Sequence, residues 1–451
     1  MQMNKRKLVV IGGDAAGMTA ASKVRREQSE REIIVFERGN HTSYSACGMP
    51  YYIGGQVESE EDLIARTPEV FRQKQHIDVR IRHEVIEIDP KNKRLKVKNI
   101  DEEKDYWESW DDLLIATGAS PIVPKLENVD ASGVFALSTL QSGINVFNFL
   151  KEKKPAKAVV VGGGYIGIEM VEAFLSRSMD VTLIDMAPQL MATLDKDMAE
   201  LILEYMTEQK VKVFLKEKLV NFKKNADGSL KSVITDKQTL PADIVILGMG
   251  IKPNAELAAR AGIKLGADDA IQVNKRQETT VPNIWAAGDC AESYHLVTQK
   301  QVHIALGTVA NKNGLVAGIN ISGGSAEFPG VLGTAITKFK ELEISRTGLS
   351  EKEAKELGVD YEAVTITSVS PAGYYPGSEK ITVKLVVNKQ TQRILGGQIV
   401  GFRGAGKRID TIATAITAGL TAQQLVDLDL AYAPPFSGVW DPVQIAARKF
   451  R

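Results

Sequence analysis

Residues 156–174 read AKAVVVGGGYIGIEMVEAF and contain the feature on which the fold depends. A run of apolar residues predicts a buried strand, a glycine turn follows, and the next residues predict a helix. Gly162, Gly164 and Gly167 match the spacing GxGxxG, and a second apolar run ends in Asp185. In such a unit, backbone N–H groups at the helix start face a pyrophosphate and the acid accepts a ribose hydroxyl. The stretch therefore predicts a dinucleotide-binding site.

The same unit occurs near the N-terminus, where residues 7–27 read KLVVIGGDAAGMTAASKVRRE and are followed by EIIVFER. Gly12 and Gly17 take the first and third glycine positions, and Glu37 ends the second strand. The middle glycine is replaced by Asp14, whose carboxylate would repel a phosphate unless its side chain points away. Alone, this degenerate copy is also consistent with a plain βαβ turn. The two copies lie 150 residues apart (162 − 12) and together predict two dinucleotides that meet face to face.

Three further stretches fit this arrangement. Residues 279–292, TTVPNIWAAGDCAE, predict a short strand that ends at Gly288 and Asp289, followed by a helical segment. An acid at such a strand end is suited to bind the ribityl chain of a flavin. Residues 113–120 (LLIATGAS) and 245–254 (VILGMGIKPN) each predict a strand with a glycine exit. We expect the chain to cross between the two nucleotide-binding domains at these exits.

The composition sets limits on the class of protein. At 451 residues the chain is long enough for about two to four domains. Its 56 basic and 56 acidic residues balance, so no net field favours nucleic acid or an anionic membrane. The sequence has no apolar run of about 18 residues that would span a bilayer. Its two cysteines suit a reducing cytoplasm, and its five histidines show no metal-binding spacing.

These motifs resemble those of the pyridine nucleotide-disulfide oxidoreductases from end to end. The resemblance implies an α/β protein with two Rossmann-like domains, for FAD and NAD(P), and a C-terminal α+β domain that forms a homodimer. It implies these domain boundaries: FAD-binding 1–120, NAD(P)-binding 121–250, FAD-binding again 251–327, and dimerisation 328–451. The residues that would contact FAD are Gly12, Gly17, Glu37, Thr117, Gly118, Gly288 and Asp289. Those that would contact NADH or NADPH are Gly162, Gly164, Gly167 and Asp185.

One cysteine lies in the stretch SYSACGMPYY, residues 43–52. Most disulfide reductases of this family carry CxxxxC beside the flavin, but the residue five before Cys47 is Thr42. The other cysteine, Cys290, follows the flavin-binding acid and is interpreted as a packing residue. A free cysteine such as Cys47 is often a small buried hydrophobe. If Cys47 instead reacts, it acts alone, and the predicted helix start after it would lower its pKa.

The surroundings of Cys47 resemble the single-cysteine branch of the family. That branch contains coenzyme A-disulfide reductases, NAD(P)H-dependent persulfide or sulfur reductases, and NADH oxidases and peroxidases. The oxidases and peroxidases typically place a histidine in the first glycine turn, where this sequence has Ala15. The difference favours thiol chemistry over peroxide chemistry.

Two segments near the C-terminus extend the resemblance. SPAGYYPGS (370–378) and DLAYAPPFSGVWDP (429–442) look like the segments that carry the active-site tyrosines of coenzyme A-disulfide reductases. The matching residues are Tyr374 and Tyr432, which the resemblance implies reach the active site of the partner subunit. The alternative is aromatic packing at the dimer interface.

Coenzyme A, as a substrate or bound ligand, would need cations for its phosphates. Thr19, Lys23 and Arg26 lie on one face of the predicted first helix and match substrate-contacting positions of the family. Charged residues on a surface helix are otherwise simply solvated. The further candidates for substrate contacts are Ser43, Lys74 and His303.

The sequence as a whole therefore predicts a homodimeric, cytoplasmic flavoenzyme. It would use NAD(P)H, with Asp185 favouring NADH, to reduce coenzyme A disulfide or coenzyme A or small-molecule persulfides and polysulfides through Cys47. One alternative is an NADH oxidase that reduces oxygen. Another is a reductase of a small iron–sulfur protein, which does not need Cys47 or the tyrosines. An alternative of another class is a non-catalytic flavoprotein whose Cys47 senses oxidation.

Overall fold

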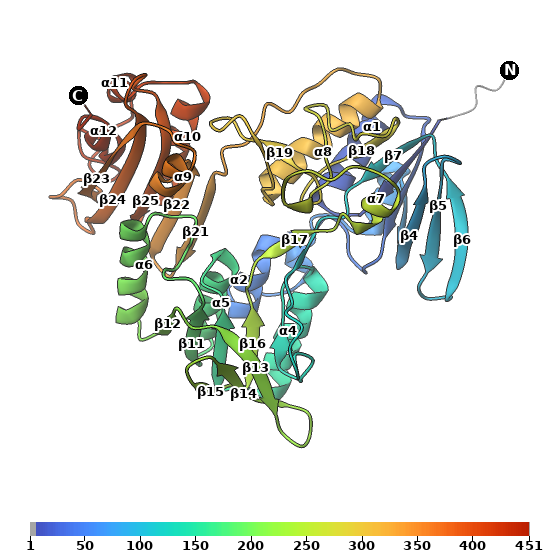
Figure 1. Cartoon of the computed structure of the whole chain (residues 1–451), viewed down its shortest axis with the longest axis horizontal. Helices are drawn as coiled ribbons and strands as arrows, with labels where there is room; N and C mark the ends of the chain where they lie inside the picture. The colour runs from blue at the N-terminus through green and yellow to red at the C-terminus, as the bar shows by residue number, and fades with distance from the viewer. Residues whose placement is uncertain (1–5, 451) are drawn as a thin grey trace.

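The computed structural model describes residues 6–450 and contains three five-stranded sheets (Figure 1). The first sheet is parallel and has the strand order β18-β7-β1-β2-β3. Its strands are β1 (Lys7–Ile11), β2 (Glu32–Glu37), β3 (Asp78–Ile81), β7 (Asp112–Ile115) and β18 (Ile284–Ala286). Helices α1 (Ala15–Glu27) and α8 (Gly307–Ile321) cover one face of this sheet. A small antiparallel sheet and helix α7 (Glu256–Arg260) cover the other.

The second sheet repeats this plan. It is parallel and has the strand order β12-β11-β10-β16-β9, so β10, β11 and β16 take the places of β1, β2 and β7. Helices pack on one face and a second small antiparallel sheet packs on the other. The strands are β9 (Val134–Phe135), β10 (Lys157–Val161), β11 (Asp180–Asp185), β12 (Lys212–Leu215) and β16 (Ile244–Leu247). The helices are α2 (Met49–Gly54), α4 (Leu140–Lys153), α5 (Tyr165–Ser176) and α6 (Lys196–Glu208).

The third sheet is antiparallel, in the order β21-β22-β25-β24-β23, and lies at the opposite end of the molecule from strands β4–β6, which lie within residues 83–109 (Figure 1). Its strands are β21 (Ala335–Phe339), β22 (Leu342–Gly348), β23 (Tyr361–Ser370), β24 (Glu379–Asn388) and β25 (Ile394–Gly401). The associated helices are α9 (Glu351–Glu356), α10 (Ile409–Thr417), α11 (Ala422–Val426) and α12 (Pro442–Ala447). The predicted α/β class with two Rossmann-like sheets and a C-terminal α+β region is thus confirmed.

The remaining elements connect or cover these sheets. The two small three-stranded sheets are β4-β5-β6 and β13-β14-β15. Their strands are β4 (His83–Asp89), β5 (Arg94–Asn99), β6 (Lys104–Ser109), β13 (Leu219–Lys224), β14 (Leu230–Thr235) and β15 (Thr239–Pro241). Helix α3 (Pro68–Gln75) precedes β3. No helix within residues 6–450 is long and apolar enough to cross a membrane.

The two glycine exits predicted as crossings lie side by side. Strand β8 (Ala119–Pro121) follows β7, strand β17 (Ile251–Pro253) follows β16, and the two pair antiparallel. The chain therefore leaves the first Rossmann-like sheet and returns to it through one two-stranded ribbon. This ribbon connects the two Rossmann-like units.

The helical segment expected directly after Asp289 is wrong. Residues 288–291 turn, and the chain continues into the short hairpin of β19 (Ser293–Tyr294) and β20 (Gln301–Val302). The N–H of Glu292 donates to the carbonyl of Ile271, and the N–H of Leu296 donates to the carbonyl of Val331. Because neighbours on both sides hold this segment extended, the helix α8 begins only at Gly307.

Candidate active site

The first glycine of each turn occupies a position that a side chain cannot share. The N–H of Gly12 donates to the carbonyl of Phe36, and that of Gly162 donates to the carbonyl of Ile184, each at 2.8 Å. Their φ angles are +108° and +104°. A Cβ at Gly12 would lie 2.1 Å from the carbonyl oxygen of Ala116, and one at Gly162 would clash similarly with the chain after β16. Both turns therefore require glycine here.

The third glycines bring each helix against its own turn. A Cβ at Gly17 would lie 2.0 Å from the carbonyl oxygen of Gly12, and one at Gly167 would lie 1.9 Å from that of Gly162. The start of α1 and of α5 is thereby packed tightly on the preceding strand exit. This geometry leaves backbone N–H groups at the two helix starts to face a pyrophosphate.

The two glycine turns differ in the residue at their middle position. Gly164 has open space where a Cβ would be, so a side chain fits there without steric cost. Asp14 takes this position in the first turn, and its carboxylate accepts a hydrogen bond from the backbone N–H of Tyr44 at 3.1 Å. Burial, with the charge of Glu37 adding to it, raises the pKa of Asp14 to about 6. The carboxylate is thus tied to the segment before Cys47.

The strand-end acids have matching hydrogen bonds. Glu37 accepts from the N–H of Gly13 at 2.9 Å and from the N–H of Gly39 at 2.6 Å. Asp185 accepts from the N–H of Gly163 at 2.6 Å and from that of Ala187 at 2.8 Å. Each carboxylate is held beside its glycine turn, which is the position suited to a ribose hydroxyl.

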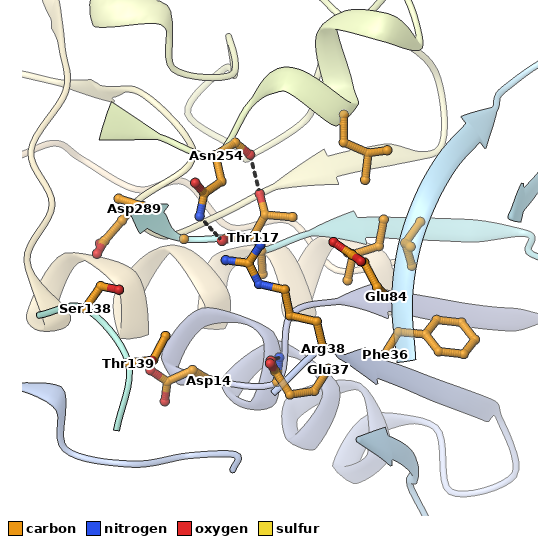
Figure 2. A pocket seen from close by; sticks show the side chains of 18 of the residues that line it. Asp14, Phe36, Glu37, Arg38, Glu84, Thr117, Ser138, Thr139, Asn254 and Asp289 are labelled. Atoms are coloured by element: carbon orange, nitrogen blue, oxygen red, sulfur yellow. Dashed lines mark hydrogen bonds between the residues drawn. The ribbon is translucent and has the colours of Figure 1, made fainter. Parts of the chain in front are cut away.

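A cavity of about 370 Å³ opens along the first turn (Figure 2). It is lined by the predicted residues Gly12, Glu37, Thr117, Gly118 and Asp289 and by several that sequence reasoning missed. Among the latter is Asn254, whose side-chain amide donates to the backbone carbonyl of Thr117 at 2.8 Å and whose backbone carbonyl accepts from the Thr117 hydroxyl at 2.6 Å (Figure 2). Asn254 is the last residue of 245–254, the second stretch at which the sequence predicts that the chain crosses between domains. Other unforeseen lining residues are Arg38, Glu84, Ser138 and Thr139.

Asp289 provides a test of whether the cavity fits a flavin dinucleotide. Its Oδ1 is buried and has no hydrogen-bond partner among the described residues. Burial raises the pKa of this carboxyl, and the charge of His303 opposes the shift. The ring Nε2 of His303 lies 2.8 Å from the carbonyl oxygen of Asp289. An unpaired buried acceptor needs a donor, and the hydroxyls of a ribityl chain supply one. The residues present therefore fit FAD.

Cys47 lies in a 3₁₀ turn (Ala46–Gly48) immediately before α2. It keeps an exposed surface, whereas Cys290 is fully buried, with its thiol donating to the carbonyls of Ile115 and Ala287. The expectation that the helix start lowers the pKa of Cys47 is wrong. Partial burial of the thiol, and then the carboxylates of Glu169, Asp289 and Asp14, raise the pKa.

The predicted substrate residues on α1 lie together. Thr19 donates its hydroxyl hydrogen to Asn311 of α8 at 2.9 Å, Lys23 pairs with Glu27, and Arg26 is exposed. Lys74 is exposed near the end of α3, which approaches α1 where Arg25 donates to the carbonyl of His76. Ser43 lies beside the first turn and donates its backbone N–H to the carbonyl of Gly13 at 3.0 Å. Their role in substrate binding stays a prediction.

The two tyrosines lie on adjacent loops of the C-terminal region. The N–H of Ala372 donates to the carbonyl of Pro434 at 3.0 Å, which joins the loop after β23 to the loop before α12. Tyr374 and Tyr432 are 75% and 47% exposed. The hydrogen bond that the Tyr374 hydroxyl donates to Tyr432 raises the pKa of Tyr374. Exposed aromatic residues also include Tyr375, Phe436 and Trp440. These exposed side chains give the two loops an aromatic surface. The third sheet, to which the loops belong, lies apart from the first sheet (Figure 1).

Comparison with known proteins follows the same division of the chain. The family profile described as pyridine nucleotide-disulphide oxidoreductase matches residues 6–314. The profile of the dimerisation domain of the same family matches residues 334–442. The two profiles together cover both Rossmann-like units and the third sheet.

Individual relatives match over nearly the full length. The chain is 43% identical to the NAD(P)H sulfur oxidoreductase (CoA-dependent) of Pyrococcus furiosus, over 99% of both chains. It is 36% identical to the NADH oxidase of Methanocaldococcus jannaschii, over 98% of both. The reduced CoADR-RHD of Bacillus anthracis has a crystal structure that superimposes with a TM-score of 0.96 at 37% identity. That match covers 100% of this chain and 80% of the other.

Proposed function

This chain belongs to the pyridine nucleotide-disulphide oxidoreductase family, and on that premise we propose that it is an FAD-dependent NAD(P)H oxidoreductase. Its substrates would be coenzyme A disulfide or persulfides and polysulfides of coenzyme A and small thiols. A relative with 43% identity carries the name of a CoA-dependent sulfur oxidoreductase, which supports a sulfur substrate.

The observation that carries the proposal is the position of Cys47. It is exposed in the segment that Ser43 and Tyr44 tie to the first glycine turn, through hydrogen bonds to Gly13 and Asp14. The other thiol, Cys290, is fully buried. A single accessible cysteine beside the predicted flavin site is suited to form one mixed disulfide or persulfide with an external partner.

We propose that the two Rossmann-like units bind different cofactors. When bound, FAD accepts hydride from NAD(P)H and makes the electron pair available for sulfur chemistry. The turn at Gly162 and the acid Asp185 would bind and orient NAD(P)H. The turn at Gly12, with Glu37 and Asp289, would hold FAD. Cys47, as thiolate, would attack one sulfur of the substrate and release the other as a thiolate.

The departing thiolate would need a hydrogen-bond donor. We propose that Tyr374 and Tyr432 of the partner subunit supply it, because a phenol is a competent donor and both are exposed on the dimerisation domain.

The residues that we propose to bind coenzyme A lie mainly on α1. Thr19, Lys23 and Arg26 would contact its phosphates. Ser43, Lys74 and His303 would make further contacts with the substrate. We also propose the division 1–120, 121–250, 251–327 and 328–451, and a cytoplasmic location in keeping with the free thiols.

A steady-state screen tests this function. The wild type and Cys47→Ser are compared with NADH and NADPH against coenzyme A disulfide, coenzyme A persulfide, polysulfide and oxygen. The wild type should reduce the sulfur acceptors faster than oxygen. Cys47→Ser should keep FAD and still accept hydride but lose sulfur turnover by at least ~100-fold, as expected when a covalent nucleophile is removed.

The oxidase and the redox sensor each have their own result in this screen. Retained sulfur turnover in Cys47→Ser would contradict the mechanism. Faster consumption of NADH with oxygen than with any sulfur acceptor would favour an oxidase, for which the 36% identity to an NADH oxidase gives support. NADH consumption near zero with every acceptor would favour a redox sensor.

A further inference from the structure

After partial burial, three carboxylates contribute to the raised pKa of the redox cysteine. Glu169 of α5, Asp289 after β18 and Asp14 at the start of α1 are the charged groups that act on the Cys47 thiol, and each opposes its ionisation. Tyr51 of α2 is the further titratable neighbour. Reactive thiols are usually found near cations, so this surrounding is unusual. The Cys47 proton therefore needs a group that can take it.

Glu169 stands out among these acids by its place in the packing. Helix α5 packs directly on α2, because a Cβ at Gly54 would lie 3.2 Å from the Cα of Ala173. Further along, Arg177 donates to the carbonyl of Ile53 at 2.9 Å. Glu169 lies one helical turn before Ala173 on α5. The residue after its hydrogen-bond partner Thr337 is Lys338, whose ammonium lies over the ring of Tyr51, one turn after Cys47.

The groups around Glu169 leave it without a cation of its own. The hydroxyl of Thr337 on β21 donates to Glu169 Oε1 at 2.7 Å. Lys338 on β21 pairs with Glu172, one turn along α5, and also lies over the ring of Tyr51 at 5.7 Å. Among residues 6–450, Glu169 makes no salt bridge. Burial and Glu172 raise the pKa of Glu169, and Thr337 and Lys338 oppose that shift. Tyr165 of α5 is the remaining titratable neighbour.

We propose that Glu169 is the proton partner of Cys47, so that the two groups share one proton across the contact between α5 and α2. This deepens the proposed function and rests on it. The step is Cys47–SH with Glu169–COO⁻ giving Cys47–S⁻ with Glu169–COOH, in which a proton moves and no electron does. Two neighbouring, partly desolvated groups cannot both carry negative charge cheaply, so ionisation of the thiol requires protonation of the carboxylate. Glu169 accepts the proton of the reacting sulfur in this scheme, and Cys47 carries the covalent chemistry.

The test measures the Cys47 thiol directly. The FAD-loaded enzyme is reduced with dithiothreitol, freed of it without oxygen, and alkylated with iodoacetamide between pH 5.5 and 9.5. One thiol should react, because Cys290 is fully buried. Glu169→Gln keeps the shape and an acceptor for Thr337 but removes the charge. We expect the apparent pKa of Cys47 to fall by about one unit, with about tenfold faster alkylation on the acidic side of the profile.

Two further variants make the result specific. Glu200→Gln removes an exposed acid of α6 in the same domain and should leave the alkylation profile unchanged. Thr337→Val removes the hydrogen bond that favours the charged form of Glu169, so it should shift the Cys47 profile in the same direction by a smaller amount. If Glu169→Gln fails to hold FAD, Thr337→Val carries the test.

An identical alkylation profile in the wild type and Glu169→Gln would overturn the proposal, as would an equal shift in Glu200→Gln. Because alkylation requires no turnover, its outcome is independent of the acceptor screen. Retained turnover in Cys47→Ser would contradict the proposed function while leaving the proton pairing intact. An unshifted profile together with an essential Cys47 would contradict the pairing alone.

Discussion

The two glycine turns have nearly the same backbone and different chemistry. Asp14 and Gly164 precede α1 and α5 with φ and ψ of −109°, −153° and −84°, −167°. The first glycines, the third glycines and the strand-end acids have matching contacts in both turns. At the middle position, the second turn is open, whereas the first carries a carboxylate bonded to Tyr44.

This difference shows how one fold serves two roles in one chain. The second turn has no side chain at its middle position, which suits a coenzyme that enters and leaves. The first turn is joined through Asp14 to the segment that carries Cys47, so the predicted flavin site and the predicted sulfur site share a direct hydrogen bond between their segments. The following predictions test this division between a coenzyme-selecting unit and a sulfur-reducing unit.

The largest effects should come from alanine at the first glycines. In Gly12→Ala, the Cβ would lie 2.1 Å from the carbonyl of Ala116 at a φ that disfavours side chains, so the enzyme should be purified without FAD. In Gly162→Ala, the equivalent distance to the carbonyl of Gly248 is 2.2 Å. This variant should keep FAD, but the rate at which NADH reduces the flavin should fall by at least ~100-fold. That loss corresponds to an increase of about 2.7 kcal/mol in the activation free energy.

Flavin absorbance after gel filtration and anaerobic mixing with NADH measure the two losses. Gly228→Ala, at a hairpin glycine with φ +83° and open space, is the matched control and should lose neither. Loss of FAD in both turn variants would show that the units do not act separately.

The tyrosines should affect sulfur reduction alone. Tyr374→Phe and Tyr432→Phe remove the donor oxygens and leave the rings in place, so both variants should form dimers and accept hydride normally. Loss of one general acid should slow disulfide or persulfide turnover by roughly 10–10³-fold. Rapid mixing of the two half-reactions checks this, with Tyr375→Phe on the same loop as control. If both variants turn over like the wild type, the tyrosines serve interface packing.

Asp185 should affect coenzyme choice alone. Its carboxylate accepts N–H groups of Gly163 and Ala187, and it is placed to accept the adenosine 2′-OH but opposes a 2′-phosphate. We expect kcat/KM to favour NADH over NADPH by at least ~tenfold, or about 1.4 kcal/mol. Asp185→Asn should reduce this ratio, while Glu37→Gln in the first turn should leave it unchanged. Equal efficiencies of the wild type with the two coenzymes would contradict the assignment.

The sequence predicted the parts of this molecule that depend on local pattern. The strands that end in Glu37 and Asp185 are buried apolar runs, and glycine spacing identifies the turns between strand and helix. Strand β22 went unpredicted because it buries Ser345, Arg346 and Thr347 among partners distant in sequence. Polar residues in the core follow from tertiary contacts, which no short-range pattern records.

The candidate site shows the same limit. The glycines and the cysteine are recognisable in the sequence, but the electrostatic environment of Cys47 is not. Partial burial, and then Glu169, Asp289 and Asp14 from three separate segments, raise the pKa of this thiol, whereas a local helix start predicted the opposite direction. Asn254 and Glu169 likewise acquire their significance only from the packing of distant elements.

The smallest expected effect concerns Asp14, the residue by which the two turns differ. Its pKa is raised to about 6 in the folded protein against an ordinary value of 3.8, mainly by burial. The folded state therefore binds the proton more tightly than the unfolded state, and stability falls as pH rises from about 4 to 6. Above that range the charged carboxylate is a cost, which Asp14→Asn removes while keeping an acceptor for Tyr44. We expect Asp14→Asn to raise the free energy of unfolding by about 1–2 kcal/mol at pH 8 and to have no effect near pH 4.

Urea unfolding at constant FAD concentration measures the free energy at both pH values. The control is Gly164→Asn, which places the same side chain in the open turn and should show no pH-dependent gain. A pH-independent effect of Asp14→Asn would mean that the carboxylate acts through packing, and the electrostatic distinction between the turns would then fail.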